Sequence, residues 1–438
     1  ARRFWCGAAQ ALVLPVLLSL QAAPWFAIFI AYSAFSSDDA SAASDIDEVF
    51  LTFMMVTIAE YIAVPLLKLL IMPRTKAGVY PLWGVYFFRN WLVQRLLPLI
   101  HFKWMQGTPV IRFFLRVLGA KVGKDAHIDL IVAGAIDLIT IGDHASLGGK
   151  LNINNTRAVG DKYIIGPVVI GNDVIIGSSC VIENDVIIGD GSELADLTSV
   201  VAGTRIPAYE YWAGSPARKV RDIDPASLPE PAEASFATRH LQTAFYTLML
   251  IVIPPLSIVP IIPTFYALDW MDQARTDWLA STFGFSNANS NWYYFLLALP
   301  ASFVMVILSC LLIVAIRWIV LPKLKPGRYS VFSGLYIRKW VVALTIEVML
   351  DSVYTIFATI YMRTWYRLLG TKIGPGSALS TNLAGRYDLV EIVAGNFIAD
   401  AVQPGGENIH RTWMELGTIK TGDKVFIGQQ AVSPLNSL

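Results

Sequence analysis

Gly166-Pro-Val-Val-Ile-Gly-Asn-Asp-Val-Ile-Ile-Gly177 belongs to a stretch in which an aliphatic residue recurs at every sixth position. The series comprises Ile164, Ile170, Ile176, Ile182, Ile188, Leu194, Val200 and Ile206. Neither the 3.6-residue period of a helix nor the two-residue period of an ordinary strand produces this pattern. The period of six predicts a three-sided parallel β-coil, in which each side is one short strand and the aliphatic residues stack inside. Cys180 lies in the small-residue series two positions earlier, so we interpret it as structural.

The same pattern occurs a second time further along the chain. Gly417-Thr-Ile-Lys-Thr-Gly-Asp-Lys-Val-Phe-Ile-Gly428 aligns with the first stretch at an offset of 251 residues (417 − 166). Leu118-Gly-Ala-Lys-Val-Gly123 aligns with Leu369-Gly-Thr-Lys-Ile-Gly374 at the same offset. Because the repeat contains hydrophobic segments as well as the six-residue pattern, a whole module was duplicated.

The composition indicates an integral membrane protein. Hydrophobic residues make up 55% of the chain and charged residues 15%, against about 25% in ordinary soluble domains. A helix needs about 20 apolar residues to cross the hydrocarbon core of a bilayer. Four stretches are long enough: Ala11–Phe35, Val49–Met72, Thr243–Ala267 and Tyr293–Leu321. They predict two transmembrane helical hairpins.

The placement of lysine and arginine predicts the orientation of these hairpins. The loop at residues 36–48 has no basic residue, and the loop at 268–292 has only Arg275, whereas basic residues cluster at the opposite ends of all four stretches. By the positive-inside rule, both coils lie on the cytoplasmic side of the plasma membrane. The formal net charge is only +1, so the orientation follows from where the basic residues lie and not from the total. We expect membrane lipid and no nucleic acid as partners. Three scattered cysteines form neither a disulfide framework nor a zinc site, and no metal site is predicted.

The domains follow one another in a repeating order. Short helices rich in arginine and tryptophan precede each coil, and they fit either the membrane interface or a core position against the coil. The predicted segments are a hairpin at 1–75, amphipathic interfacial helices at 76–120, a hexapeptide-repeat domain at 121–222, a linker at 223–240, a second hairpin at 241–325, further amphipathic helices at 326–370 and a truncated second hexapeptide-repeat domain at 371–438.

These motifs carry a family resemblance. The hexapeptide ladder closed by Gly214-Ser-Pro-Ala217 resembles the left-handed parallel β-helix acyltransferases. The fuller arrangement, with a membrane hairpin, Leu118-Gly-Ala-Lys-Val-Gly123 and Ile136-Asp-Leu-Ile-Thr-Ile-Gly-Asp143, resembles the C-terminal region of ε-poly-L-lysine synthetase-like nonribosomal peptide synthetases. The resemblance implies upstream adenylation and carrier domains, a further unit beyond Leu438, and tandem coils that pack as an intramolecular pseudo-trimer. The expected fold is therefore a mixed membrane protein, in which transmembrane hairpins alternate with left-handed β-helix domains.

The implied reaction is attack of an amine on a thioester, which needs a base. His127 and His144 are available in the first copy, and His144 is the preferred candidate, although the second copy has Phe397 there. The second copy offers His410 instead, so the two copies share a scaffold but not a chemistry. Asp137 recurs as Asp388, which fits either a role in positioning a base or ammonium group, or a turn carboxylate.

The end of the first ladder is the predicted binding segment for the thioester carrier. Trp212, Ser215, Arg218 and Lys219 follow the last strand. The basic pair would bind the phosphate of phosphopantetheine or of coenzyme A, or else anionic lipid headgroups. Trp212 would pack on the pantetheine or cap the coil. No cofactor is expected to be bound permanently, because the carrier-bound thioester is a substrate.

Three functions fit these features. The leading hypothesis is amide-bond formation between a carrier-bound aminoacyl thioester and an amine within a poly-amino-acid synthetase. The first alternative is a stand-alone membrane acetyltransferase that uses coenzyme A. The second alternative is a non-catalytic scaffold that holds upstream synthetase domains at the membrane.

Overall fold

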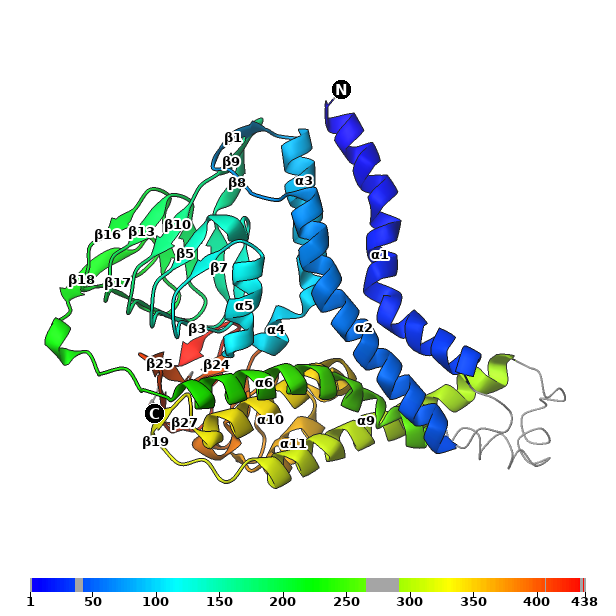
Figure 1. The fold of residues 1–438 in the computed structure, drawn as a ribbon. Coiled ribbons are helices and arrows are strands. Elements are labelled where there is room, and N and C mark those ends of the chain that lie inside the picture. The colour runs from blue at the N-terminus through cyan, green and yellow to red at the C-terminus, as the bar shows by residue number, and fades with distance from the viewer. Residues whose placement is uncertain (1, 36–41, 265–290, 406, 434–435, 437–438) are drawn as a thin grey trace, which may run out of the picture.

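The two copies of the module fold as two units of the same design (Figure 1). The structure is a computed structural model that describes residues 2–35, 42–264, 291–405, 407–433 and 436. Each unit begins with a helical hairpin, continues through short connecting helices and ends in a coil of short strands. We call these the first coil, residues 121–213, and the second coil, residues 372–433. The helices of both hairpins extend away from the coils toward the same side of the molecule.

Four described helices are long and apolar enough to cross a membrane, as predicted. Their spanning portions are Arg2–Ala23, Asp47–Ile71, Phe236–Thr264 and Ala298–Val320. The helices themselves are α1 (Arg2–Phe35), α2 (Ala42–Ile71), α6 (Phe236–Val252) and α9 (Asn291–Val320). Pro254 and Pro255 cannot donate backbone hydrogen bonds, so α6 gives way to the 3-10 helix η4 (Pro254–Ile258). The predicted end of the third stretch at Ala267 and nearly all of the predicted 268–292 loop lie outside the described residues.

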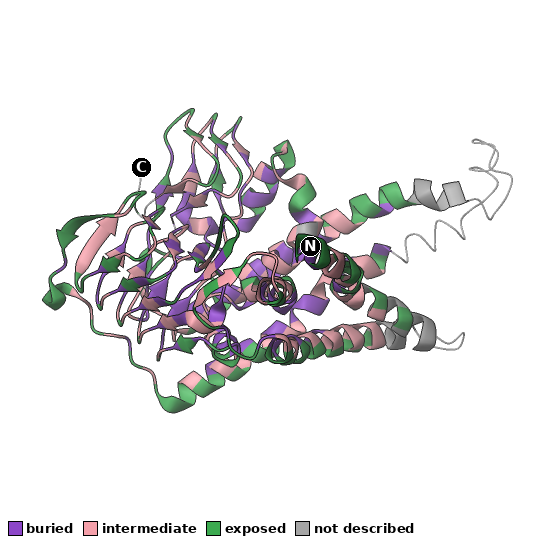
Figure 2. Ribbon diagram, turned by 90° about the horizontal axis from the view of Figure 1, so that it is seen from above, coloured by how far each residue is buried: buried purple, intermediate pink, exposed green. Residues whose placement is uncertain are grey.

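Many large apolar side chains on these helices are exposed, and exposed residues are green along the helices in Figure 2. Leu12, Leu70, Phe303 and Ile319 are each more than 70% exposed. So many exposed apolar side chains on long helices suit contact with lipid chains better than contact with water.

The first coil consists of three parallel sheets, one for each side. Val168 pairs with Val186, Ile175 with Glu193 and Val181 with Ser199. Each circuit therefore takes 18 residues, which is three sides of six. The first sheet contains β2 (Lys121–Val122), β5 (Ile139–Ile141), β10 (Val168–Ile170), β13 (Val186–Ile188) and β16 (Arg205–Ile206). The second contains β3 (His127–Ile128), β6 (Ser146–Leu147), β11 (Ile175–Ile176), β14 (Glu193–Leu194) and β17 (Glu210–Ala213), with β18 (Arg218–Asp222) antiparallel at its edge. The third contains β4 (Ile131–Ala133), β7 (Leu151–Asn154), β12 (Val181–Glu183) and β15 (Ser199–Val200).

The aliphatic ladder lines the interior of this coil, with one correction at its start. Ile170 and the later members of the series are buried, but Ile164 is only partly buried. Ile164 lies in β9 (Lys162–Ile165), which pairs antiparallel with β8 (Thr156–Val159) and β1 (Gly78–Pro81). The prediction for Ile164 was wrong because a hairpin interrupts the circuit between β7 and β10. Cys180 is fully buried, and burial raises the pKa of its thiol to about 12, in agreement with a structural role.

The second coil repeats this plan. Its sheets consist of β20 (Lys372–Ile373), β22 (Val390–Ile392) and β27 (Ile419–Lys420); of β21 (Ala378–Leu379), β23 (Phe397–Ile398) and β28 (Phe426–Ile427); and of β24 (Gln403–Pro404) and β29 (Val432–Ser433). The interrupting hairpin also recurs, as β25 (Asn408–His410) and β26 (Trp413–Leu416) beside β19 (Gly327–Ser330).

Short helices precede each coil, and the last helix of each set packs against the first strands of the coil. They are α3 (Val85–Leu96), η1 (Leu97–Ile100), α4 (Phe102–Met105) and α5 (Pro109–Val117) in the first unit, and α10 (Gly334–Val353), η5 (Tyr354–Ile356) and α11 (Ile360–Leu369) in the second. α5 buries Ile111 and Leu115, whereas Phe113 is 61% exposed. The buried face of α5 agrees with the expected core position against the coil. The exposed ring of Phe113 suits the other expectation, a place at the membrane interface.

Candidate active site

The two coils meet along a surface that we call the seam. On the first unit it comprises β3 and the turn residues Asp125, His144 and Asp173, and on the second unit α10 and the β25–β26 hairpin. Lys150 Nζ donates to the Ala401 carbonyl at 3.4 Å, and the two residues occupy equivalent turns of the two coils. Residues about 250 positions apart therefore come together here.

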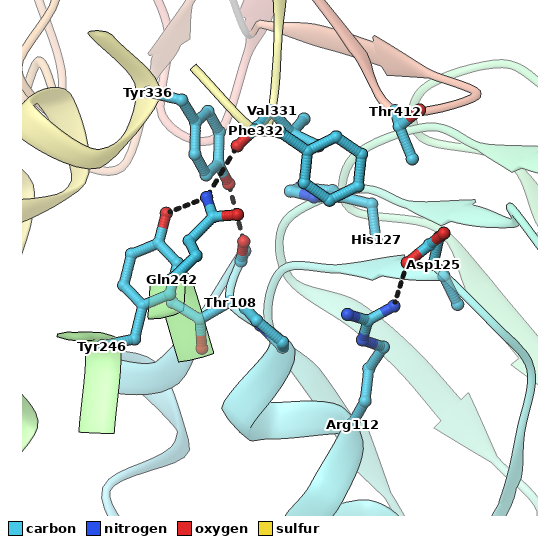
Figure 3. A pocket seen from close by; sticks show the side chains of 13 residues that line it. Thr108, Arg112, Asp125, His127, Gln242, Tyr246, Val331, Phe332, Tyr336 and Thr412 are labelled. Carbon is cyan, nitrogen blue, oxygen red and sulfur yellow. Dashed lines mark hydrogen bonds and ion pairs between the residues drawn. The ribbon is translucent and has the colours of Figure 1, made fainter. Parts of the chain in front are cut away.

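A small cavity of about 40 Å³ opens at this seam (Figure 3). The first unit contributes Gly107, Thr108, Pro109, Arg112, Asp125, Ala126 and His127, and the second contributes Gln242, Tyr246, Val331, Phe332, Tyr336 and Thr412. A volume of this size accommodates a few water molecules or the end of an extended group. It is far below the several hundred Å³ of a site that encloses a whole small ligand.

A histidine–aspartate pair borders the cavity. Side chains alternate along β3, so Ile128 points into the coil and His127 points out of it toward the second unit. His127 Nε2 lies 3.1 Å from Asp129 Oδ1, and the imidazole is 8% exposed. The carboxylate thus holds one ring nitrogen and leaves the other available for proton transfer. The sequence patterns favoured His144 over His127, and Asp129 is a site residue that they did not indicate.

Gly107 makes the close approach of the two units possible. Its φ is +70°, and a Cβ atom there would collide with the hydroxyl of Tyr336 and lie 3.2 Å from His127 Cε1. With glycine in place, the Tyr336 hydroxyl donates to the Gly107 carbonyl at 2.7 Å. Opposite, Asp125 pairs with Arg112 at 3.3 Å and with Arg239 of the second unit at 2.5 Å.

The structure places both predicted catalytic histidines, His144 and His410, at the seam. No direct contact between these two side chains is seen among the described residues. His144 Nδ1 lies 3.9 Å from Asp173 Oδ1, which is too long for a hydrogen bond. Arg411 pairs with the other oxygen of Asp173 at 2.8 Å and directly follows His410. Burial and the Arg411 charge lower the pKa of His410 to about 4, so its imidazole is neutral at pH 7.

The backbone also corrects one pairing between the copies. His144 and Gly395 both have left-handed turn conformations, and Ser146 in β6 corresponds to Phe397 in β23. The second-copy equivalent of His144 is therefore Gly395, not Phe397. A glycine has no group that could exchange a proton, so the copies differ here as expected.

Asp137 and Asp388 lie away from the cavity and join each coil to its membrane hairpin. Asp137 pairs with Lys68 of α2 at 2.7 Å and accepts hydrogen bonds from the backbone and hydroxyl of Thr75. Asp388 pairs with Arg317 of α9 at 2.5 Å and accepts from the Leu324 backbone at 3.0 Å. All four charged side chains are at most 10% exposed. These contacts explain why the aspartate occurs in both copies, because in each copy it anchors the coil to its hairpin. This structural role is closer to the expected turn carboxylate than to a group that positions a base.

The predicted carrier-binding residues lie at the opposite end of the first coil. In the sheet order β17-β14-β11-β6-β3, Trp212 is four strands from His127, or roughly 19 Å. Trp212 packs partly on the core and donates to Glu210 at 2.8 Å, while Lys219 pairs with Glu210 and Asp222. Ser215 and Arg218 are exposed. Only an extended ligand could touch both this end and His127.

The architecture and the seam define a class: hexapeptide-repeat proteins that carry helices long and apolar enough to span a membrane and a polar site between tandem coils. No known family profile matches the chain. It is 33% identical over 435 residues to the delta-poly-L-ornithine synthetase of Acinetobacter baumannii. The aligned region covers 98% of this chain and 32% of the relative. The chain thus spans about a third of the length of that relative. The resemblance to poly-amino-acid synthetases drawn from the sequence motifs is confirmed.

Solved structures with local likeness include a hexapeptide-repeat acetyltransferase and an N-acyltransferase. An acetyltransferase from Vibrio cholerae in complex with acetyl coenzyme A is 23% identical, with a TM-score of 0.25, over 28% of this chain and 84% of the other. An N-acyltransferase from Bacillus cereus in complex with dTDP and coenzyme A is 17% identical, with a TM-score of 0.21, over 25% of this chain and 75% of the other.

Proposed function

We propose that this chain forms amide bonds, by transferring an aminoacyl group from a thioester to an amine at the seam. The observation that carries the proposal is the buried His127, which lines the inter-unit cavity and pairs with the partly exposed Asp129. The relation to a poly-ornithine synthetase over nearly the whole chain supports the same chemistry.

In the proposed reaction, His127 is the general base and Asp129 is its positioning residue. The amine nitrogen attacks the thioester carbonyl carbon, and His127 removes a proton from that nitrogen. The new C–N bond forms, the C–S bond breaks, and the proton passes to the departing thiolate. Asp129 holds the imidazole in one orientation and stabilises its protonated form. His144 and His410 lie at the same seam and form a second candidate group.

We propose that a phosphopantetheine arm delivers the donor from a carrier domain loaded by an adenylation domain in the same protein. Arg218 and Lys219 at the far end of the coil would meet its phosphate, and the arm would follow the coil toward His127. The coils would be left-handed, as the resemblance implies. They would lie on the cytoplasmic side of the plasma membrane, where basic residues cluster at the ends of the hairpins.

A third copy of the unit would complete a pseudo-trimer. Ser146 and Ile175 of the first coil correspond to Phe397 and Phe426 of the second. Ser146 is buried and Ile175 is partly buried, whereas the two phenylalanine rings are exposed and stacked 5.6 Å apart. An exposed pair of aromatic rings on one coil fits the docking of another unit.

The test is amide formation by the protein that carries this chain, reconstituted in lipid nanodiscs with a carrier-bound aminoacyl thioester. We expect His127→Gln to lower the rate about 10²- to 10⁴-fold, and the exposed His240→Gln control to leave it unchanged. An unchanged rate in His127→Gln would refute the assignment of the base.

The same preparation distinguishes the two alternatives. Turnover with acetyl coenzyme A but not with the carrier thioester would indicate the stand-alone acetyltransferase. Retained synthesis after simultaneous loss of His127, His144 and His410 would indicate the scaffold.

A further inference from the structure

One arginine at the seam cavity has most of its hydrogen-bonding capacity unused. Arg112 lies on α5 and extends toward the cavity, and its side chain is 17% exposed (Figure 3). A guanidinium carries several N–H donors. Within the described part of the chain, Arg112 makes a single hydrogen bond, from Nη1 to Asp125 Oδ1 at 3.3 Å. Its remaining donors are therefore available to a group that enters the cavity.

A second arginine holds the same carboxylate more closely. Arg239 Nη1 pairs with the other oxygen of Asp125 at 2.5 Å. Its position is fixed from two further sides, because its Nε donates to the Ala234 carbonyl at 3.2 Å and its guanidinium lies 5.3 Å from the centre of the Phe332 ring. Two guanidinium groups thus share one carboxylate, which leaves one positive charge unmatched beside the cavity. This charge favours a negative charge that develops inside the cavity.

The second unit repeats the arginine but not its carboxylate. At the offset of 251 residues, Arg112 of α5 aligns with Arg363 of α11. Asp125 aligns with Gly376, and both of these turn residues have a positive φ. Arg363 has no ion pair with a described residue, and its buried Nε has no hydrogen-bond partner among them. The arginine therefore recurs without the carboxylate, so pairing with Asp125 alone does not explain its presence.

Acyl transfer needs a hydrogen-bond donor where negative charge develops. When the amine nitrogen bonds to the thioester carbonyl carbon, an electron pair of the C=O bond moves onto oxygen, and His127 takes the proton from nitrogen. The C=O bond re-forms when the C–S bond breaks. A donor already in place for this oxygen lowers the barrier. Because the cavity measures only about 40 Å³, a carbonyl that reaches His127 inside it also lies close to Arg112.

We propose that Arg112 is a catalytic residue that donates hydrogen bonds to the oxyanion of the tetrahedral intermediate. The assignment rests on the proposed amide-forming function, because that function places the thioester carbonyl in the cavity. Asp125 holds one nitrogen of the guanidinium and leaves the others for the oxyanion. In the intermediate, the protonated His127 faces Asp129 and the oxyanion faces Arg112, so each new charge meets an opposite one.

The test compares two unreactive derivatives of phosphopantetheine. One carries a ketone next to the methylene on sulfur, and the other carries a tetrahedral methylphosphinate anion at the same position. Their equilibrium binding is measured with the protein that carries this chain, in lipid nanodiscs. We expect wild type to bind the phosphinate at least about tenfold more tightly than the ketone. Arg112→Gln should abolish that preference and lower the rate of amide formation about 10²- to 10³-fold.

Two further variants separate the oxyanion role from packing at the seam. Arg239→Gln breaks the shorter ion pair to Asp125 but leaves Arg112 in place, so it should keep the preference for the phosphinate. Arg112→Lys keeps the charge without the planar fork and should keep part of that preference.

Three outcomes overturn the proposal: equal binding of both derivatives to wild type, an unchanged preference in Arg112→Gln, or the same loss of preference in Arg112→Gln and Arg239→Gln. Absence of amide formation by wild type counts against the proposed function instead. The two failures are distinguishable because the binding comparison needs no turnover.

Discussion

Lys68 Nζ lies 2.7 Å from Asp137, and Arg317 takes the corresponding place against Asp388 at 2.5 Å. Lysine in one copy and arginine in the other have the same role, because each joins the end of a membrane helix to the first turns of a coil. Each carboxylate also accepts from the chain just after the helix, at Thr75 or Leu324. A coil that moved relative to its hairpin would have to break this contact.

Breaking one partner of this pair should be costly. Asp137→Asn leaves the buried Lys68 ammonium without a counter-charge, and we expect about 3–5 kcal/mol of lost stability. Thermal unfolding in detergent checks this, with the exposed Asp161→Asn as control. A melting temperature equal to that of the control would show that the pair does not anchor the coil.

Gly107→Ala should disrupt the seam. The new methyl group would meet the Tyr336 hydroxyl at a residue whose φ is +70°. Gly160 is the matched control, because its φ is +61° and nothing lies within 4 Å of the position that a Cβ atom would take. Both alanines cost about 1–2 kcal/mol of backbone strain, so only Gly107→Ala should also lower amide formation. Equal activity in the two variants would show that amide formation does not depend on close packing at the seam.

Acid should loosen the seam through His410. Its folded pKa of about 4 lies below the ordinary value of 6.5, so the unfolded or separated state binds the proton more readily. This contribution is complete above pH 6.5 and is lost as the pH falls toward 4. The charged groups that face it are Arg411, Asp173 and Arg328. His410→Gln should flatten the decline in stability between pH 6.5 and 4, and an unchanged decline would exclude His410 as its source.

Cys180 should resist thiol reagents in the folded protein. It is fully buried, and burial raises its thiol pKa to about 12, so almost no thiolate forms at neutral pH. With Cys6 and Cys310 replaced by serine, maleimide labelling of Cys180 should occur only on unfolding. Rapid labelling without denaturant would contradict the burial of Cys180 inside the first coil.

Much of the fold could be predicted from the sequence because its signals are local. Apolar stretches of about 20 residues predict membrane helices, and aliphatic residues six apart predict a three-sided coil. The exception at Ile164 has a physical cause, because the inserted hairpin preserves the spacing while it turns that residue out of the ladder. The His127–Asp129 pair could also have been predicted from the sequence, since residues two apart on a strand share a face.

The seam was decided by the tertiary structure alone. His127 becomes a candidate base because Tyr336, more than 200 residues away in the sequence, packs against it at the seam. The position of Asp137 in the sequence does not reveal its partner Lys68, 69 residues earlier. Period and hydrophobicity specify which elements form, since they act between near neighbours. Which charged groups meet depends on how two finished units pack, and no short-range pattern encodes that packing.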